Sequence, residues 1–255
     1  MSDGQAVTAM DKATRLDLLR QRLVDGGTVR IADMAGDLGA SEMTIRRDLD
    51  TLEALGEAHR VRGGARVVGG SGFAVRSGRN MQAKVAIATK LVGVVPDTGT
   101  IAIDSSTTMA MLANLLTSAR DLLVVTNGMQ AFEALAGRRG VRAVLCGGEL
   151  DCDTGSLVGP VAEATVENFR FDAVFVSAAA VDVADGAFEH TLGEASMVRA
   201  LARQADRVVV GVDTAKLAQG GVVRSLQWSE VSLVATELTP GSPRLAGLSQ
   251  VTELR

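Results

Sequence analysis

The 255-residue chain contains few cysteines, few histidines and no long apolar run. Its two cysteines, Cys146 and Cys152, are too few for a disulfide framework, and no His/Cys cluster accompanies them to form a metal site. We interpret both as packing residues, and we expect His59 and His190 at the surface because neither has a partner signature. Hydrophobic residues make up 47% of the chain, yet no stretch reaches the roughly 20 continuous apolar residues of a membrane helix. The sequence therefore predicts no disulfide scaffold, no metal site and no membrane span.

Two further absences concern targeting and nucleotide binding. Residues 1–4 lack the basic and apolar character of an export signal, so we expect a cytoplasmic protein. No G-x-G-x-x-G motif opens a strand–helix unit, which argues against a nucleotide-binding Rossmann enzyme. The net charge of −4 says little about partners. The length leaves room for one small domain of about 60 residues and one larger core.

The segment Ser41–Leu49 predicts a short helix that presents arginines on one side. An α-helix has about 3.6 residues per turn, so the apolar residues of this segment and its continuation share one face, namely Ile45, Leu49, Leu52 and Leu55. The opposite face is free to contact a partner and carries Met43, Arg46, Arg47 and Asp50. Ser41 stands at the expected N-cap, because its hydroxyl can accept from the amides of the next turn.

Two amphipathic segments precede this helix. Leucines at helical spacing predict a first helix over residues 12–25, which Gly26-Gly27 ends. Its polar side carries Arg15, Arg20 and Arg22. A second helix is predicted over residues 31–38, and Gly39 can stop it by adopting a left-handed C-cap. The second and third helices therefore meet at a tight turn.

A hairpin follows the three helices. Residues 57–68 form two strand-like runs around a Gly63-Gly64 turn. The order of these elements predicts a winged helix-turn-helix domain over residues 12–68, in which the helix that begins at Ser41 is the recognition helix. We expect this helix in the major groove of DNA and the hairpin arginines on phosphates or in a narrow minor groove. The predicted DNA-contacting residues are Ser41, Met43, Thr44, Arg46, Arg47, Arg60, Arg62 and Arg66.

The predicted DNA-binding domain is not basic overall. Residues 1–70 contain ten Lys and Arg against eleven Asp and Glu. An Arg-Arg pair followed by Asp48 and Asp50 is also typical of a solvated helix face with local ion pairs. The surrounding order of helices and hairpin favours DNA contact over this alternative. Any affinity must then come from a local stripe of arginines, and it should fall steeply with salt.

The remainder of the chain predicts an α/β domain. Gly69-Gly70-Ser71-Gly72 is typical of a flexible connection, so we predict a linker over residues 69–79. In residues 80–240, predicted helices alternate with short apolar runs, and the first helical run extends from Met81 to Val92. The predicted strands cover residues 100–104, 122–126, 141–146, 173–179, 207–212 and 232–236. This alternation predicts a mostly parallel sheet flanked by helices.

Small polar residues follow several of these strands. Ligands of such sheets bind at the carboxyl ends of the strands, where helix N-termini offer unpaired amides. The candidate ligand-binding residues are Asp104, Ser105, Ser106, Thr107, Thr108, Thr126, Asn127, Gly147, Gly148, Asp213 and Lys216. The helix that begins after Ser105 could hold a phosphate, with Lys216 supplying charge. Each of these short polar segments, taken alone, is also typical of an ordinary turn or helix cap. Their recurrence after successive strands is what indicates a site. Glu194 and Arg199 lie on a predicted helix over 191–204, where a surface ion pair is the default interpretation.

The segment Ser41–Leu49, with Leu52 and the Arg62-Gly63-Gly64-Ala65 turn, resembles the DNA-binding signature of the DeoR family of bacterial repressors. Nearly the whole chain can be laid on the two-domain plan of that family. The resemblance implies a C-terminal sensor and oligomerisation domain related to ribose-phosphate isomerases, a phosphorylated sugar as effector, a DNA operator as partner, and a homo-oligomer, either dimer or tetramer. No other cofactor is implied. Carried over by position, the pocket would consist of Asp104, Ser106, Thr107, Thr108, Thr126, Asn127, Gly148, Asp213 and Lys216, with Glu194 as a weaker assignment.

The resemblance also supplies a rival function, that of a sugar-phosphate isomerase-like enzyme. Those enzymes carry an Asp-Gly-Ala-Asp-Glu segment and a Lys-Gly-Gly-Gly stretch, which give carboxylates and an ammonium for proton transfer. The equivalent positions here are 177–182 and 186–190, where neither motif is present. The sequence therefore predicts a binding site without turnover, in a protein that is not an enzyme.

Overall fold

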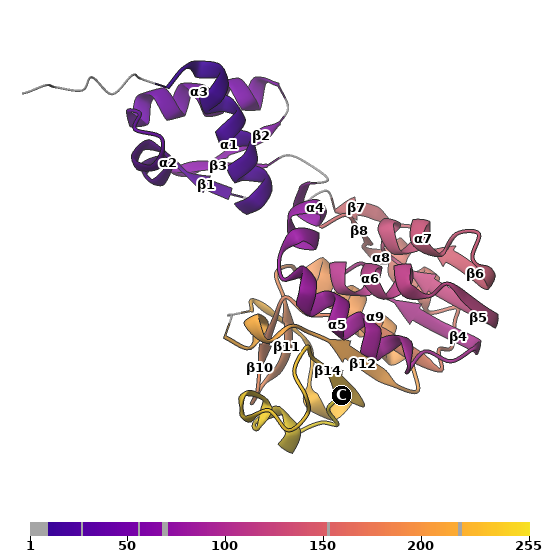
Figure 1. The fold of residues 1–255 in the computed structure, drawn as a ribbon. Helices are drawn as coiled ribbons and strands as arrows, with labels where there is room; N and C mark the ends of the chain where they lie inside the picture. The colour runs from indigo at the N-terminus through magenta and orange to yellow at the C-terminus, as the bar shows by residue number, and fades with distance from the viewer. Residues whose placement is uncertain (1–9, 27, 56, 68–70, 152–153, 219–220) are drawn as a thin grey trace, which may run out of the picture. The chain divides into compact units, whose positions relative to one another are not determined.

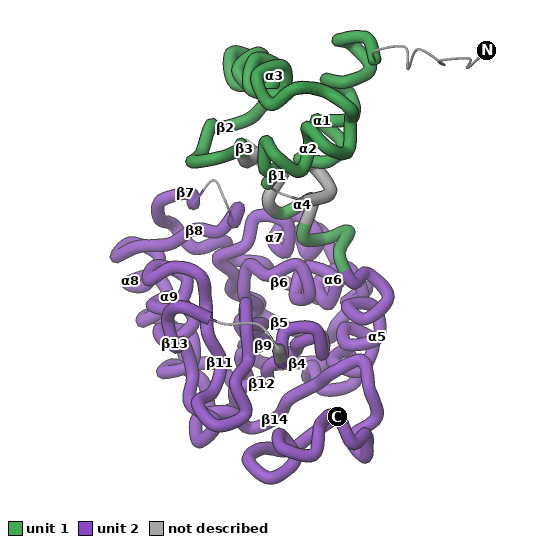
Figure 2. The backbone as a smooth tube through the Cα atoms, turned by 90° about the vertical axis from the view of Figure 1, so that its left-hand side faces the viewer, with its two compact units in different colours: residues 1–79 green, residues 80–255 purple. Residues whose placement is uncertain are grey.

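The computed structural model contains two compact units, residues 1–79 and 80–255 (Figures 1 and 2). The residues that the structure describes are 10–26, 28–55, 57–67, 71–151, 154–218 and 221–255. Within these ranges, no helix combines the length and the apolar character that a membrane span requires. Cys152, one of the two cysteines interpreted as packing residues, lies outside them, whereas Cys146 is buried.

Unit 1 combines helices with a three-stranded antiparallel sheet. Its elements are α1 (Lys12–Gly26), β1 (Thr28–Arg30), α2 (Ile31–Asp37), α3 (Glu42–Ala54), β2 (Ala58–Val61), β3 (Gly64–Val67) and α4 (Ser71–Gly78). The strands lie in the order β1-β3-β2. Side chains from the helices meet in one apolar core, whose largest fully buried members are Leu19, Leu23, Ile45, Leu49 and Leu52. This is the winged helix-turn-helix arrangement that the sequence predicts.

The turn between α2 and α3 follows the predicted local chemistry. Gly39 has a φ of +59°, the left-handed conformation that glycine adopts without steric cost. The hydroxyl of Ser41 accepts from the backbone amide of Thr44 at 3.1 Å, so Ser41 is the N-cap of α3. The placement of Leu55 on the apolar face was wrong. Its side chain is 57% exposed because α3 ends at Ala54, one residue earlier.

Two elements of unit 1 differ from the sequence expectation. Strand β1 was not predicted, because three residues are too short to show a periodicity, and it pairs with β3 through Val29 and Ala65. Helix α4 occupies residues 71–78, where a flexible linker was expected, since glycine weakens a helix without forbidding one. The first part of that predicted linker, Gly69-Gly70, lies outside the described residues.

A buried ion pair joins α1 to α3. Arg15 was expected on the polar side of its helix, and a solvated face was the disfavoured alternative for Asp48, but both residues are buried, at 9% and 2% exposure. The Arg15 guanidinium donates to the two carboxylate oxygens of Asp48 at 2.5 and 3.3 Å, and also to the carbonyl of Met10 at 2.8 Å. The partners are 33 residues apart in sequence, so helical spacing alone could not reveal the pair.

Unit 2 is built on a six-stranded parallel sheet. In spatial order its strands are β14 (Leu233–Ala235), β12 (Val208–Gly211), β9 (Ala173–Val176), β4 (Thr98–Ile103), β5 (Ser118–Thr126) and β6 (Arg139–Leu145). Helices cover both faces, and they are α5 (Met81–Val92), α6 (Thr107–Leu115), α7 (Met129–Leu135), α8 (Pro160–Val166) and α9 (Leu192–Arg203). The predicted α/β class with a mostly parallel sheet is confirmed.

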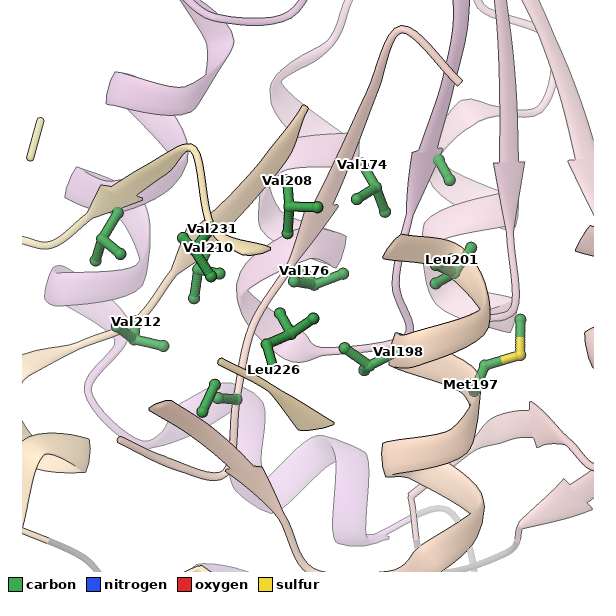
Figure 3. Packing of buried hydrophobic residues seen from close by; sticks show 14 of the residues in the cluster. Val174, Val176, Met197, Val198, Leu201, Val208, Val210, Val212, Leu226 and Val231 are labelled. Atoms are coloured by element: carbon green, nitrogen blue, oxygen red, sulfur yellow. The ribbon is translucent and has the colours of Figure 1, made fainter. Parts of the chain in front are cut away.

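The two faces of the sheet carry separate apolar cores. Alternate side chains of a strand point to opposite faces, so Val174 and Val176 of β9 pack in one core while Phe175 packs in the other. Helices α8 and α9 cover the first core, and Figure 3 shows Val198 and Leu201 of α9 beside the valines of β9 and β12. Helices α5, α6 and α7 cover the second core.

Two small antiparallel sheets accompany the main sheet and were not predicted. One has the order β10-β11-β13, with β10 (Ala180–Asp182), β11 (Gly186–Glu189) and β13 (Val223–Leu226). The other pairs β7 (Glu149–Asp151) with β8 (Ser156–Val158). Short 3₁₀ helices complete the unit, namely η1 (Thr214–Ala218), η2 (Trp228–Glu230), η3 (Pro243–Leu245) and η4 (Leu248–Gln250). Strands of three or four residues show too few alternations to be recognised in sequence.

The substitution Asp48→Ala is expected to destabilise unit 1 selectively, by about 3–5 kcal/mol, because it leaves the buried Arg15 charge without its carboxylate. Far-UV circular dichroism reports on both units, whereas the single tryptophan, Trp228, reports on unit 2. In a urea titration, Asp48→Ala should therefore move the part of the dichroism transition that comes from unit 1 to lower urea concentration. The transition of the Trp228 fluorescence should not change.

Asp17→Ala is the matched control for this prediction. Asp17 also pairs with an arginine, Arg20, but its side chain is 74% exposed, so its loss should cost about 0–1 kcal/mol. Equal shifts for Asp48→Ala and Asp17→Ala would contradict the structural role of the buried pair.

Candidate functional site

The order of the strands defines where a ligand can bind unit 2. Strands β4, β5 and β6 succeed one another toward one edge of the sheet, whereas β9, β12 and β14 succeed one another toward the other edge. The direction of the connections therefore reverses between β4 and β9. In sheets of this type, ligands bind at the carboxyl ends of the strands beside this reversal.

Asp104 joins the carboxyl ends of β4 and β9. Its side chain is buried, and its two oxygens accept from the backbone amides of Ser106 at 2.8 Å and Ser177 at 2.7 Å. Burial raises the pKa of Asp104, while the hydrogen bonds from Ser106 and Ser177 and the charge of Lys216 act in the opposite direction. The carboxyl group thus fixes the loop that opens α6 against the neighbouring strand.

The N-terminus of α6 follows this loop. Ser106 is the N-cap, and its hydroxyl accepts from the amide of Met109 at 3.2 Å. Thr107 and Thr108 form the first turn and are buried, whereas Ser105 is half-buried. Within the described residues, the buried hydroxyl oxygen of Thr108 has no hydrogen-bond partner. The amides of the first turn and the positive end of the helix dipole favour an anion here.

The end of β5 packs directly against the same loop. A Cβ at Gly128 would lie 2.6 Å from Ser105 Cα, so only glycine fits this approach. The hydroxyl of Thr126 accepts from the Gly128 amide at 3.0 Å. The Asn127 amide nitrogen donates to the carbonyl of Leu157 at 3.1 Å, while its buried side-chain oxygen has no partner among the described residues. A buried acceptor of this kind normally has a donor, and a ligand could supply it.

Lys216 brings a positive charge to the strand ends. It lies on η1, after β12, and its ammonium donates to Ser177 Oγ at 3.1 Å and to the Ala178 carbonyl at 2.6 Å. Both acceptors follow β9 directly. The ammonium also acts electrostatically on Asp104 and Glu189. The structure therefore brings Lys216, Asp104 and the start of α6 together at the carboxyl ends of the strands.

Glu189 is a further candidate for this site, and the sequence had not indicated it. It lies on β11 with 7% of its surface exposed, and Ser225 Oγ lies 3.5 Å from its Oε1. Burial raises the pKa of Glu189 well above its usual range, Glu194 and Asp104 raise it further, and Lys216 opposes them. Residues 177–182 do not contain the cluster of carboxylates that the isomerases carry. Strand β11 instead contributes one buried carboxyl group, that of Glu189. Its only sequence signal was an acidic residue in an otherwise apolar run.

Other predicted ligand residues lie differently. Asp213 is buried, and its carboxylate accepts from the Asn80 side chain at 3.0 Å and from the Ala215 amide at 3.2 Å. It lines a separate cleft of about 520 Å³ at the start of α5, together with Asn80, Glu237 and Arg244. Among the described residues, no hydrogen bond joins the Asp213 side chain to Ser177 or Ala178, both of which Lys216 contacts.

The remaining predicted ligand residues are at the margin of the site. Gly148 has a φ of +131°, and a Cβ there would lie 2.7 Å from the carbonyl of Val158, so this position requires glycine. Gly147 is exposed. Glu194 is half-buried in the first turn of α9, where its carboxylate accepts from the Thr191 hydroxyl at 3.2 Å. Arg199 donates to the carbonyl of Arg224 at 2.7 Å.

The predicted DNA-contacting residues divide into exposed and internally bound ones. Met43 and Arg47 are exposed on α3, and Arg62 is exposed in the wing turn. Arg46 is also exposed and lies 3.7 Å from Glu42. The hydroxyls of Ser41 and Thr44 are 2.9 Å apart and form a hydrogen bond with one another at the N-cap of α3.

Arg60 is held within its own domain. Its Nε lies 3.1 Å from the Asp50 carboxylate, and its Nη1 donates to the Gly64 carbonyl at 3.0 Å. The wing is thereby tied to α3. His59 is exposed, as is His190 in unit 2, and both were predicted at the surface. The side chain of Arg66 lies outside the described residues.

Comparisons with known proteins match both units. The model of the DeoR-like helix-turn-helix domain matches residues 15–69, and the model of the DeoR C-terminal sensor domain matches residues 79–237. Similar curated proteins include the regulator GlpR of Haloferax volcanii, which is 32% identical over 84% of this chain and 85% of its own length. The lactose phosphotransferase system repressor of Lactococcus lactis is 34% identical over 68% of this chain and 70% of its own length.

Among solved structures, ribose 5-phosphate isomerase A from Neisseria gonorrhoeae is 17% identical and covers 53% of each chain, with a TM-score of 0.39. The family models together span both units, and the sensor model alone matches more than half of the chain. The chain therefore belongs to the DeoR family of transcriptional regulators.

Proposed function

We propose that this regulator represses genes of sugar metabolism and that a phosphorylated sugar controls its binding to DNA. The observation that supports this most directly is the site at the strand reversal. The open start of α6 lies beside buried acceptors of Thr108 and Asn127 that lack partners in the described residues, and the Lys216 ammonium belongs to the same site. Such a site suits an anionic ligand that also carries hydroxyl donors.

The relatives support the same function. One is named a lactose phosphotransferase system repressor in Lactococcus lactis, and a protein of the same name from Streptococcus mutans is 28% identical over 96% of this chain and 99% of its own length. For the present chain, the proposed effector-binding residues are those of the predicted pocket, namely Asp104, Ser105, Ser106, Thr107, Thr108, Thr126, Asn127, Gly147, Gly148, Glu194, Asp213 and Lys216. Glu189 joins them.

On the DNA side, Arg47 and Arg62 are the strongest candidates. Both side chains are exposed, and neither forms an ion pair within the part of the chain that the structure describes. Arg47 belongs to the face of α3 opposite the core, so it can reach base edges in the major groove. Arg62 stands at the turn of the wing, where it can reach phosphates. Arg60 supports the wing through Asp50 and Gly64.

The proposed mechanism is a thermodynamic linkage. Effector binding favours a conformation in which two DNA-binding units cannot engage their half-sites together, so ligand and DNA weaken one another equally. This mechanism requires at least a dimer, in line with the oligomer expected from the family resemblance.

Binding without turnover is part of the proposal. An isomerase needs carboxylates placed to move a proton along the sugar carbons. In residues 177–182 the one carboxylate is Asp182, which is exposed and accepts from the amides of Ala184 and Asp185. The rival function of an isomerase-like enzyme would be supported if incubation with a bound sugar phosphate gave an isomerised product by NMR.

Fluorescence anisotropy on the DNA upstream of its own gene tests the whole proposal. The full chain is titrated onto that DNA and onto a random duplex at two salt concentrations, with and without a panel of sugar phosphates. We expect specific binding that one class of sugar phosphate weakens. Absence of specific binding under every condition would remove the regulator function and move the enzyme to first place.

Arg47→Ala is expected to weaken binding to the specific DNA by about 1–3 kcal/mol, because it removes an exposed donor of the recognition helix. The control is Arg20→Ala, which also removes an arginine from unit 1. Arg20 is already bound to Glu57 at 2.5 Å and to Asp17 at 2.8 Å, so its loss should change the affinity little. Equal losses for the two variants in the anisotropy titration would remove the recognition-helix assignment.

Thr107→Asp is expected to abolish the response of DNA binding to sugar phosphates, because it places a carboxylate where the phosphate would approach α6. Thr117→Asp is the control, since Thr117 is exposed just before β5, at the opposite edge of the sheet. Anisotropy with and without the sugar phosphate measures both variants. A full response in Thr107→Asp would mean that the phosphate binds elsewhere.

A further inference from the structure

Within the part of the chain that the structure describes, few hydrogen-bond donors reach the buried carboxyl group of Glu189. The Ser225 hydroxyl has one proton, and it lies 3.2 Å from the Ala187 carbonyl but 3.5 Å from Glu189 Oε1. The Ala179 amide, which also acts on this carboxyl group, donates to the Phe188 carbonyl at 2.9 Å. Both nearby donors therefore form their shorter hydrogen bonds with backbone carbonyls of β11 and not with the Glu189 carboxyl group.

The charges around Glu189 leave its negative charge poorly balanced. Asp104 from the end of β4 and Glu194 from α9 add negative charge, whereas Lys216 from η1 opposes them. The Lys216 ammonium is directed at Ser177 Oγ and at the Ala178 carbonyl. A buried carboxylate with weak donors and acidic neighbours is costly, so Glu189 favours its protonated form until a cation or strong donors reach it.

The position of Glu189 relates it to the proposed effector site. Its strand, β11, pairs with β10, which begins three residues after Ser177. Ser177 is bound both by Asp104, whose loop opens α6, and by Lys216. Lys216 and Asp104 also act electrostatically on Glu189, so its carboxyl group lies near the start of α6. In this inference, the remaining polar groups of an effector, held by its phosphate at α6, lie on the side of Glu189.

We propose that Glu189 reads an ammonium group on the effector, so that the sugar phosphate recognised by this chain is an amino sugar phosphate. An ammonium brings three donors and a positive charge, whereas a hydroxyl brings one donor and no charge. Hydrogen bonds between charged groups are roughly twice as strong as neutral ones. This inference rests on the proposed function, because it assigns the chemistry of the ligand at the same site.

Isothermal titration calorimetry on the full chain tests the inference with defined probes. Glucosamine 6-phosphate and galactosamine 6-phosphate are compared with glucose 6-phosphate and galactose 6-phosphate, which carry a hydroxyl in place of the amine. We expect one amino sugar phosphate to bind about tenfold to a hundredfold more tightly than its matched hexose phosphate. N-acetylglucosamine 6-phosphate, whose nitrogen is uncharged, should lose this preference.

Variants of Glu189 connect the preference to this side chain. Glu189→Gln should reduce the preference to less than about threefold, and Glu189→Asp should retain part of it, because the charge remains. Asp185→Asn is the matched control, since Asp185 is an exposed carboxylate on the same hairpin, and it should keep the wild-type preference. If Glu189→Gln fails to fold by thermal unfolding of Trp228 fluorescence, Glu189→Asp and the wild-type panel decide.

Three results would overturn the inference. They are equal or tighter binding of the hexose phosphates by the wild type, an undiminished preference in Glu189→Gln, and no binding of any probe. The first two leave the proposed function intact, because sugar phosphates still bind. The third removes the proposed sugar-phosphate effector as well, so the two failures are distinguishable.

Discussion

The carboxyl group of Asp104 is the contact on which the architecture of the sensor unit depends. It accepts from amides at the ends of two strands, β4 and β9, at the point where the connections of the sheet reverse. A buried carboxylate is tolerated only when donors compensate its lost hydration, and here the amides of Ser106 and Ser177 do so. The same two bonds orient the start of α6 and the loop that Lys216 contacts. One buried acid therefore brings the start of α6, the proposed anion-binding end of the site, together with the Lys216 ammonium.

Unit 1 uses a buried acid for a different purpose. Asp48 belongs to the same helix as the exposed Arg47, yet its carboxylate points into the domain and binds Arg15 of α1. The adjacent positions differ because successive residues of a helix are about 100° apart around its axis. The pair fixes α3 against α1 and leaves Arg47 for a partner. Because other arginines, such as Arg60, are bound internally, few arginines of unit 1 are left for the proposed contact with DNA.

Local chemistry was predictable from the sequence, and long-range contacts were not. The cap at Ser41, the left-handed Gly39 and the six strands of the main sheet follow from neighbouring residues, so periodicity and turn chemistry found them. The pairing of Arg15 with Asp48 depends on the packing of two helices. The burial of Glu189 depends on β11 pairing with β13, whose residues lie more than 30 positions away in sequence. Such contacts have no signal in a single sequence until the fold is known.

The proposed effector site has ends with opposite electrostatic requirements. The start of α6 presents amides and the positive end of a helix dipole, which favour the phosphate. Glu189 presents a poorly compensated carboxyl group, which favours a donor or a cation. A ligand with a phosphate at one end and an ammonium at the other satisfies both ends in only one orientation, because reversing it would place each charge beside its like. Opposite requirements at the two ends therefore select the orientation of the ligand as well as its class.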